Sequence, residues 1–170
     1  VQTCALPICL INVAYNASSS TVIILDNSIT GMTGHQQNPT TGFNLKGDPC
    51  TKIDLETLCR AVGIRRVRVV DPYDLAACEK AITEELAAAG PGVIISRRPC
   101  VLLKTVKAKP AVKVDPESCR SCKKCMKLGC PAIHMEGEGK TAKAMVDPTL
   151  CVGCGVCEQL CAFGAIKGGN

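Results

Sequence analysis

The sequence predicts an α/β protein in two parts, a parallel-sheet domain followed by a small, cysteine-rich α+β domain. In the first part, short apolar runs rich in β-branched residues alternate with helical patterns, as in a parallel sheet crossed by helices. In the second part, eight of the fourteen cysteines of the 170-residue chain fall after residue 118, in two runs of similar spacing. The composition, with 46% hydrophobic and 21% charged residues, is that of a folded protein.

Three short strands are predicted in the first part, at residues 21–25, 66–70 and 93–96. Their apolar, β-branched residues are typical of parallel strands buried on both faces. A segment without apolar periodicity, residues 26–48, follows the first strand directly. Loops longer than about 15 residues are usually functional or disordered, and open α/β sheets bind ligands at the carboxyl ends of their strands. We therefore expect a ligand site in this loop; a solvated surface excursion is the alternative.

Helices are predicted between the strands from their caps and their periodicity. Asp54 should begin a helix that ends at Gly63. Asp74 should begin a longer helix that reaches Ala89, with its apolar positions 75, 78, 82 and 86 on the face toward the sheet. A short helix at residues 10–15 should precede the first strand, and right-handed crossovers should join the strands.

An internal repeat forms the second part, after a basic, proline-containing linker. The pattern Val-Asp-Pro-x-x-Cys-x-x-Cys-x-x-Cys starts at Val114 and again at Val146. A fourth cysteine follows each run, Cys130 in the first and Cys161 in the second. A short repeat that cannot bury a core alone predicts two halves packed around a shared interior.

The cysteine spacing indicates iron–sulfur clusters rather than disulfides. Three thiolates with two residues between neighbours can bind three corners of a cubane, and in two-cluster ferredoxins the fourth ligand comes from the other run. Zinc is the alternative, but structural zinc sites usually use two separated C-x₂-C pairs. We therefore predict two [4Fe–4S] clusters. One ligand set is Cys119, Cys122, Cys125 and Cys161, and the other is Cys151, Cys154, Cys157 and Cys130.

Each run departs in one respect from the bacterial ferredoxin pattern C-x₂-C-x₂-C-x₃-C-P. The first run has Pro131 but four residues before Cys130, and the second has three residues before Cys161 but Ala162 in place of proline. These differences should perturb the two fourth-ligand positions unequally, so the two clusters should differ in reduction potential.

The remaining composition excludes several classes of protein. Six further cysteines, at positions 4, 9, 50, 59, 78 and 100, show no pairing pattern and are interpreted as free, buried thiols, which predicts a reducing compartment, the cytoplasm. No apolar run reaches the ~18–20 residues of a membrane span. With eight thiolates on two clusters, the formal charge falls from +5 to about +1. That charge and the presence of only two Tyr, two Phe and no Trp argue against nucleic-acid binding.

The two parts resemble two known domains. The repeat resembles a two-cluster bacterial-type ferredoxin domain. The first part resembles the thiamine-diphosphate-binding domain of 2-oxoacid:ferredoxin oxidoreductases, through the segments Leu25–Ser28 and Met32–Gln36. In the order of its domains and in the longer gap of its first cysteine run, the chain resembles the alpha subunits of indolepyruvate:ferredoxin oxidoreductases. We expect the start to comprise residues 1–9 and the partial thiamine-diphosphate-binding domain residues 10–104. The linker should follow at residues 105–113, and the ferredoxin domain at residues 114–170.

The resemblance implies a site for Mg²⁺ and thiamine diphosphate. Asn27 matches a side-chain ligand of Mg²⁺ and Ile29 matches a backbone-carbonyl ligand, and such hard oxygen donors suit this ion. The residues expected beside the diphosphate are Thr33, Gly34, His35 and Gln36; for His35 a solvated loop histidine is the alternative. The family's Gly-Asp-Gly motif does not occur in the chain. Residues 1–9 stand where it would precede the first helix, and we expect them to be a non-native or truncated start.

The resemblance also implies a function for the whole enzyme: oxidative decarboxylation of an aryl 2-oxoacid, indolepyruvate, to an acyl-coenzyme A. The clusters would relay single electrons to an external ferredoxin, and a beta subunit of the same oxidoreductase would be the partner. The chain is expected to be the C-terminal part of the alpha subunit, inactive alone and without catalytic residues. Neither nucleic acid nor a membrane is an expected partner. The alternatives are a stand-alone ferredoxin-like electron carrier and an oxidoreductase for another 2-oxoacid.

Overall fold

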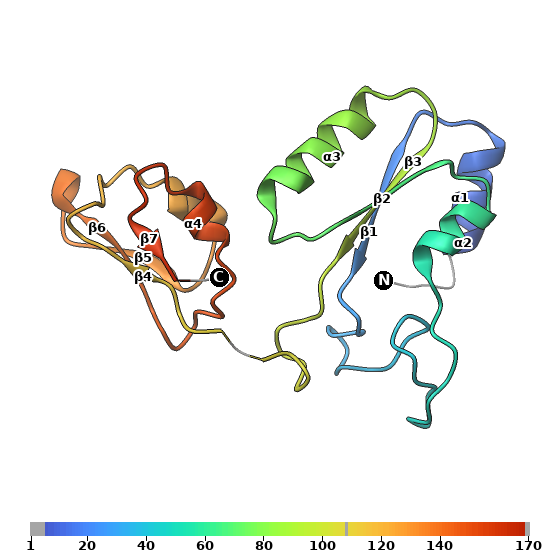
Figure 1. The fold of residues 1–170 in the computed structure, drawn as a ribbon, viewed down its shortest axis with the longest axis horizontal. Helices are drawn as coiled ribbons and strands as arrows, with labels where there is room; N and C mark the ends of the chain where they lie inside the picture. The colour runs from blue at the N-terminus through green and yellow to red at the C-terminus, as the bar shows by residue number, and fades with distance from the viewer. Residues whose placement is uncertain (1–5, 108, 169–170) are drawn as a thin grey trace. The chain divides into compact units, whose positions relative to one another are not determined.

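The computed structural model describes residues 6–107 and 109–168 (Figure 1). The chain forms two compact units, Val1–Leu103 and Lys104–Asn170. Of the expected non-native start, residues 1–5 lie outside the described residues. None of the helices in the described part of the chain has the length and hydrophobicity of a membrane span.

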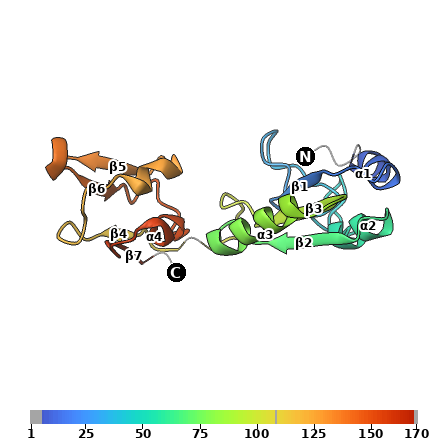
Figure 2. The ribbon, with the colours of Figure 1, turned by 90° about the horizontal axis from the view of Figure 1, so that it is seen from above.

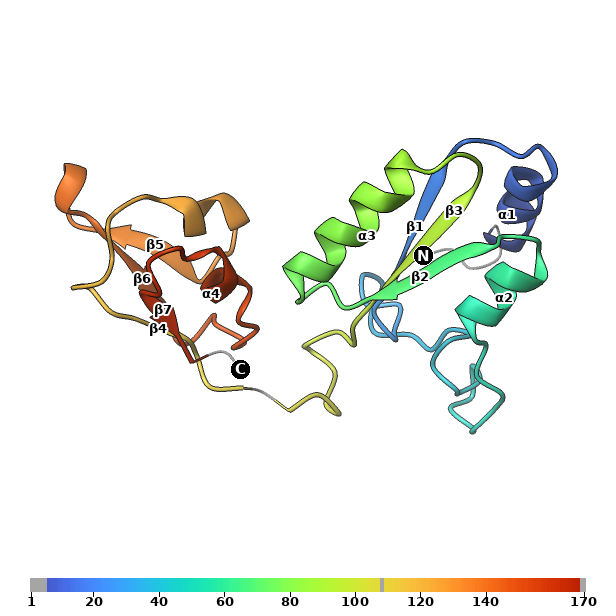
Figure 3. The same ribbon diagram turned by 45° about the horizontal axis from the view of Figure 1, so that its top comes forward.

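The first unit is built on a three-stranded parallel sheet with the strand order β1-β3-β2. Its strands are β1 (Thr21–Asp26), β2 (Arg66–Val70) and β3 (Gly92–Arg97). A helix precedes each strand: α1 (Leu6–Tyr15), α2 (Leu55–Ala61) and α3 (Leu75–Ala87). Helices α1 and α2 lie on one face of the sheet and α3 on the other (Figure 3). The predicted alternation of strands and helices is confirmed.

Helices α2 and α3 begin at the aspartates that the sequence indicates. The Asp54 side chain accepts a hydrogen bond from the Glu56 N–H at 3.0 Å, and the Asp74 side chain accepts one from the Ala77 N–H at 3.0 Å. Each bond satisfies a backbone donor that the first turn of a helix leaves unpaired. After α2, Gly63 has a φ of +102°, a conformation that glycine adopts readily.

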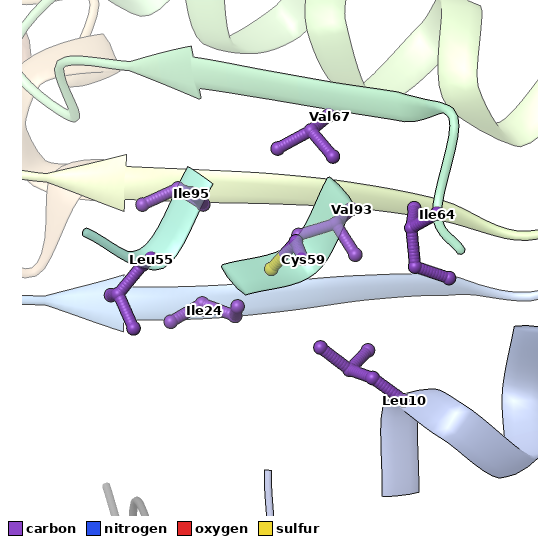
Figure 4. Close-up of a cluster of buried hydrophobic side chains, with 8 residues drawn as sticks. All are labelled: Leu10, Ile24, Leu55, Cys59, Ile64, Val67, Val93 and Ile95. Carbon is purple, nitrogen blue, oxygen red and sulfur yellow. The ribbon is translucent and has the colours of Figure 1, made fainter. Parts of the chain in front are cut away.

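The core of the first unit lies between the sheet and helices α1 and α2 (Figure 4). It consists of Leu10, Ile24, Leu55, Cys59, Ile64, Val67, Val93 and Ile95. The expectation that all three strands are buried on both faces holds only for the central strand β3. Strand β1 is at the edge of the sheet, and on its other face Ile23 is 50% and Leu25 64% exposed. The physical reason is that α3 packs on β2 and β3.

Helix α3 buries a different face from the one that its apolar periodicity predicts. Its buried residues are Ala81 and Glu85, whereas Ile82 is 39% and Leu86 72% exposed. The Glu85 carboxylate accepts hydrogen bonds from the Nε atoms of Arg66 at 3.0 Å and Arg68 at 2.7 Å, both on β2. Two guanidinium groups neutralise the buried charge, so an ionic contact takes the place of the expected apolar one.

The second unit consists of two small antiparallel sheets. One pairs β4 (Lys113–Val114) with β7 (Ile166–Lys167), and the other pairs β5 (Ile133–Glu136) with β6 (Lys143–Val146). Figure 2 shows the two sheets as separate layers. The remaining elements are the 3₁₀ helices η1 (Lys124–Leu128) and η2 (Gly139–Thr141) and the helix α4 (Val156–Leu160). Because β4 comes from the first repeat and β7 from the second, the pairing β4–β7 joins the two halves.

Candidate functional site

A hollow in the second unit is lined by four cysteines that come from both repeats. The hollow and the solvent at its mouth together hold about 380 Å³ of space between atoms. Three of its cysteines, Cys119, Cys122 and Cys125, belong to the first run, and the fourth, Cys161, belongs to the second. Apolar side chains, among them Met135 and Ile166, complete the wall. The structure thus brings together the four cysteines that the sequence assigns to one ligand set.

The cysteines of the other set lie around Cys157, which is 5% exposed at the start of α4. The pKa of the Cys157 thiol is raised to about 11, chiefly by burial and in part by the neighbouring Cys154, Cys151 and Cys130. Cys130 of the first run and Cys151 of the second run both pack against the core cluster that contains Cys157.

Backbone N–H groups point at the sulfur atoms that line the hollow. The N–H of Ala165 donates to Cys161 Sγ at 3.3 Å. Burial raises the pKa of the Cys119 thiol, but hydrogen bonds from the backbone of Ala144 and Ser121, with the charge of Lys143, outweigh burial and hold that pKa below its ordinary value. Cysteine binds metals as the thiolate, and hydrogen bonds to cluster sulfurs tune reduction potentials.

The two cysteine loops have the same backbone conformation at equivalent positions. Ser121 and Lys123 have φ values of +55° and +58°, and Gly153 and Gly155, at the corresponding positions of the second run, have +66° and +73°. Glycine adopts this left-handed conformation without steric strain, whereas other residues are strained by about 1–2 kcal/mol. The two repeats are therefore similar in backbone conformation as well as in sequence.

The donors of the second unit fit iron–sulfur clusters. Soft thiolate ligands of this kind select Fe–S clusters, zinc or Cu(I). Within residues 6–107 and 109–168, no three His, Cys, Asp or Glu side chains are close enough to share one metal ion. The four thiolates of a cubane bind four different irons, so they lie further apart than the four ligands of a single zinc ion.

The predicted cofactor loop of the first unit is anchored by Asp26, the last residue of β1. This carboxylate is 8% exposed and accepts hydrogen bonds from Arg97 Nε at 2.9 Å and from the Ser28 N–H at 3.1 Å. The hydroxyl of the buried Thr40 lies 3.5 Å from it. Of these residues, only Asp26 lies in a segment that the sequence marks, Leu25–Ser28, and its role as an anchor was not predicted. The signal for that role is an acidic residue at the end of an apolar strand. Neither Arg97 nor Thr40 was expected at this site.

Asn27 and Ile29 lie directly after β1, at the carboxyl end of the sheet. The Asn27 side-chain oxygen accepts a hydrogen bond from the Ile29 N–H at 3.3 Å, and the Asn27 backbone carbonyl accepts one from the Cys100 N–H at 2.9 Å. The backbone carbonyl of Ile29 accepts no backbone hydrogen bond from the described residues. Asn27 is exposed, whereas Ile29 is 5% exposed. Amide and carbonyl oxygens are hard ligands that suit Mg²⁺, so the donor types of these two residues fit the ion.

The residues expected beside the diphosphate form an exposed turn. Backbone hydrogen bonds of 3.0 and 3.1 Å between Thr30 and Gln36 close it. The Thr33 hydroxyl hydrogen-bonds to the Gln36 side chain, and Gly34 and His35 have φ values of +109° and +60°. All four expected residues, 33–36, are exposed, so a ligand can reach them.

The cysteines outside the two runs are free where the structure describes them, as expected. Only Cys59 is buried; Cys78 and Cys100 are half-buried, and Cys9 and Cys50 are exposed. The expectation that these thiols are buried is therefore wrong for most of them, because Cys9 and Cys78 lie at exposed or half-buried positions of the helices α1 and α3, and Cys50 and Cys100 lie in loops. Cys4 lies outside the described residues.

Comparisons with known proteins relate both units to known domains. Residues 8–96 match the model of the thiamine pyrophosphate enzyme C-terminal TPP binding domain, and residues 144–167 match the 4Fe-4S binding domain. Over 93% of its length, the chain is 41% identical to the indolepyruvate oxidoreductase subunit IorA of Pyrococcus horikoshii and to that of Thermococcus kodakarensis, and 37% identical to that of Archaeoglobus fulgidus. It spans only 25%, 25% and 26% of these relatives. No solved structure matches the chain.

Proposed function

Because the chain belongs to the family of thiamine pyrophosphate enzymes, whose C-terminal TPP binding domain matches residues 8–96, we propose that it is part of the alpha subunit of an indolepyruvate oxidoreductase. The whole enzyme would oxidatively decarboxylate aryl 2-oxoacids to acyl-coenzyme A, with ferredoxin as the electron acceptor. The observation that carries this proposal is the order of a TPP-binding domain and two cysteine runs along one chain. Six indolepyruvate oxidoreductase subunits are 36–41% identical to it over 93% of the chain.

The first unit would hold the diphosphate end of the cofactor. Asn27 and the carbonyl of Ile29 would bind Mg²⁺, and Thr33, Gly34, His35 and Gln36 would contact the phosphates. Thiamine diphosphate supplies the nucleophilic carbon and the electron sink for decarboxylation. The contacts of Asp26 with Arg97 and Ser28 support this assignment, because they fix the loop on which Asn27 lies.

The second unit would carry electrons away from the reaction, one at a time, through two [4Fe–4S] clusters. Cys119, Cys122, Cys125 and Cys161 would hold one cluster, and Cys151, Cys154, Cys157 and Cys130 the other. Support comes from the cysteines that line the hollow and from the packing of Cys130 against the core cluster that contains Cys157. The partner in this proposal is a beta subunit of the same oxidoreductase. The compartment is the cytoplasm, where thiols stay reduced.

A whole alpha subunit containing this sequence, produced with its beta subunit, tests the proposal. We expect thiamine-diphosphate-dependent release of CO₂ from indolepyruvate, coupled to ferredoxin reduction in the presence of coenzyme A. Pyruvate, 2-oxoglutarate and phenylglyoxylate, assayed in parallel, distinguish another 2-oxoacid oxidoreductase. A protein that binds iron but no thiamine diphosphate would instead be a stand-alone electron carrier.

A further inference from the structure

We propose that an acidic one-electron carrier protein docks on a basic surface beside the first cysteine run, so that electrons leave the protein at the site of Cys119, Cys122, Cys125 and Cys161. This basic surface consists of Arg120, Lys123, Lys124 and Lys127. The inference rests on the proposed function and deepens it, since it names the face of the protein and the cluster that the carrier meets.

The two cysteine runs share their spacing but not their charge. Residues 117–128 of the first run contain four basic residues and one acidic residue, whereas the equivalent residues 149–160 contain one acidic residue and no basic one. The fold does not require this difference, because the two loops have equivalent backbones. Lys123 even adopts, with a φ of +58°, the left-handed conformation that Gly155 adopts in the second run. Strained residues of this kind concentrate at functional sites.

The charges of the basic surface are available to a partner. All four side chains are exposed, and none forms an ion pair with another residue of the described part of the chain. Arg120, Lys123 and Lys124 line the same hollow as the four cysteines, and Cys122 is itself exposed. A carrier held by these charges would therefore lie close to the first-run site, as rapid electron transfer requires.

The second run is closed to such a partner on its corresponding loop. Gly153 is buried, and a Cβ atom at this position would lie 2.4 Å from the carbonyl oxygen of Pro110 and 2.8 Å from Cβ of Lys109. The chain segment that precedes β4 thus packs directly on the second cysteine loop. Ser121, the counterpart of Gly153 in the first run, is half-buried and lines the hollow.

Lys143 adds a positive charge to the first-run site. Its Nζ donates a hydrogen bond to the backbone carbonyl of Cys119 at 2.6 Å. The equivalent position of the first repeat, 32 residues earlier, is the uncharged Ala111. A cation beside a cluster favours the reduced, more negatively charged form, so the first-run site should hold an arriving electron more readily than the second-run site. This order of affinity places the exit at the first run.

Complementary charge increases the rate of encounter between proteins by about 10- to 1,000-fold and makes this rate sensitive to salt. The basic surface therefore selects a carrier with an acidic face. In each productive encounter, the protein loses one electron and the oxidised carrier gains one, with no bond made or broken.

Stopped-flow oxidation of the iron-reconstituted, dithionite-reduced chain tests this inference with two carriers of opposite charge: plant-type ferredoxin, which is acidic, and cytochrome c, which is basic. We expect the variant Lys124→Glu/Lys127→Glu to react about 10-fold more slowly with ferredoxin at low salt, and faster with cytochrome c. The matched control is Lys104→Glu/Lys107→Glu, which changes two exposed lysines at the same separation. We expect it to react with ferredoxin at the unaltered rate.

Equal rates for the two double variants, or a ferredoxin rate that does not fall with added salt, would overturn the inference. The iron content of every sample is measured first. If the glutamate variant has lost iron, Lys124→Gln/Lys127→Gln replaces it, with a smaller expected slowing. Dithionite supplies the electrons, so the result does not depend on thiamine diphosphate or on any 2-oxoacid. A failure of the proposed function would appear in the decarboxylation assay and not in this one.

Discussion

Paired cysteine substitutions distinguish crossed from local ligation of the two clusters. The hollow that contains Cys161 together with Cys122 predicts that these two residues serve one cluster. Cys130, which packs against the core cluster that contains Cys157, is the remaining fourth cysteine and is predicted to serve the other. We compare Cys122→Ala/Cys161→Ala, which removes two ligands of one set, with Cys122→Ala/Cys130→Ala, which removes one ligand of each.

The expected magnitudes follow from the number of ligands left in each set. The unaltered chain should bind about eight irons, four per cluster. Cys122→Ala/Cys161→Ala leaves all four cysteines of the second set in place, so about four irons should remain. Cys122→Ala/Cys130→Ala leaves three cysteines in each set, so the iron content should fall toward zero. Local ligation within each run predicts the reverse order.

Iron and acid-labile sulfide are measured per chain after anaerobic reconstitution, together with visible absorption and the EPR spectrum of the reduced protein. Cys50→Ala, which removes an exposed thiol outside the two runs, is the control and should keep about eight irons. More iron in Cys122→Ala/Cys130→Ala than in Cys122→Ala/Cys161→Ala would refute crossed ligation. Bound zinc without visible absorption in the unaltered chain would refute the clusters themselves.

Three further predictions concern single residues. Glu85→Gln should lower the free energy of unfolding by about 2 kcal/mol near neutral pH, because it weakens two charge-assisted hydrogen bonds to arginines that can regain water. Burial raises the pKa of Glu85, but the bonds from Arg68 and Arg66 hold it below its ordinary value. The contribution of the ionised Glu85 to stability is therefore lost as the pH falls through that lowered pKa. If urea unfolding shows that Glu85→Gln loses the same stability at acidic and at neutral pH, this explanation is wrong. Gly153→Ala should remove about half of the iron, because its Cβ would lie 2.4 Å from the Pro110 carbonyl, whereas Gly164→Ala, with a φ of +61° and open space around it, should keep the iron. In a whole subunit, Asn27→Ala should abolish thiamine diphosphate binding in calorimetry and retain iron; normal binding would rule out the Mg²⁺ assignment.

The features that the sequence predicts correctly depend on neighbours along the chain. The caps at Asp54 and Asp74 act within one helical turn, so the sequence indicates where α2 and α3 begin. The spacing of Cys119, Cys122 and Cys125 is likewise local, and the structure places these three cysteines around one hollow.

The features that the sequence analysis did not predict depend on residues far apart in the chain. The buried face of α3 depends on a bond from Glu85 to Arg66, 19 residues away, and apolar periodicity takes no account of a carboxylate neutralised in this way. The anchor of the cofactor loop joins Asp26 to Arg97, 71 residues away. Lys143 reaches the carbonyl of Cys119 from a hairpin 24 residues later. A local pattern can mark one member of such a pair, as the acidic residue at the end of β1 does, but not its distant partner.

The mixed origin of the hollow has a consequence for how the protein matures in the cell. Its wall includes Cys119 and Cys125, but also Cys161, Phe163 and Ile166. The first cysteine run is synthesised before these later residues. A nascent chain that ends between the two runs has three of the four thiols and an open wall. Under the proposed crossed ligation, the first-run site is complete only after both repeats have been translated.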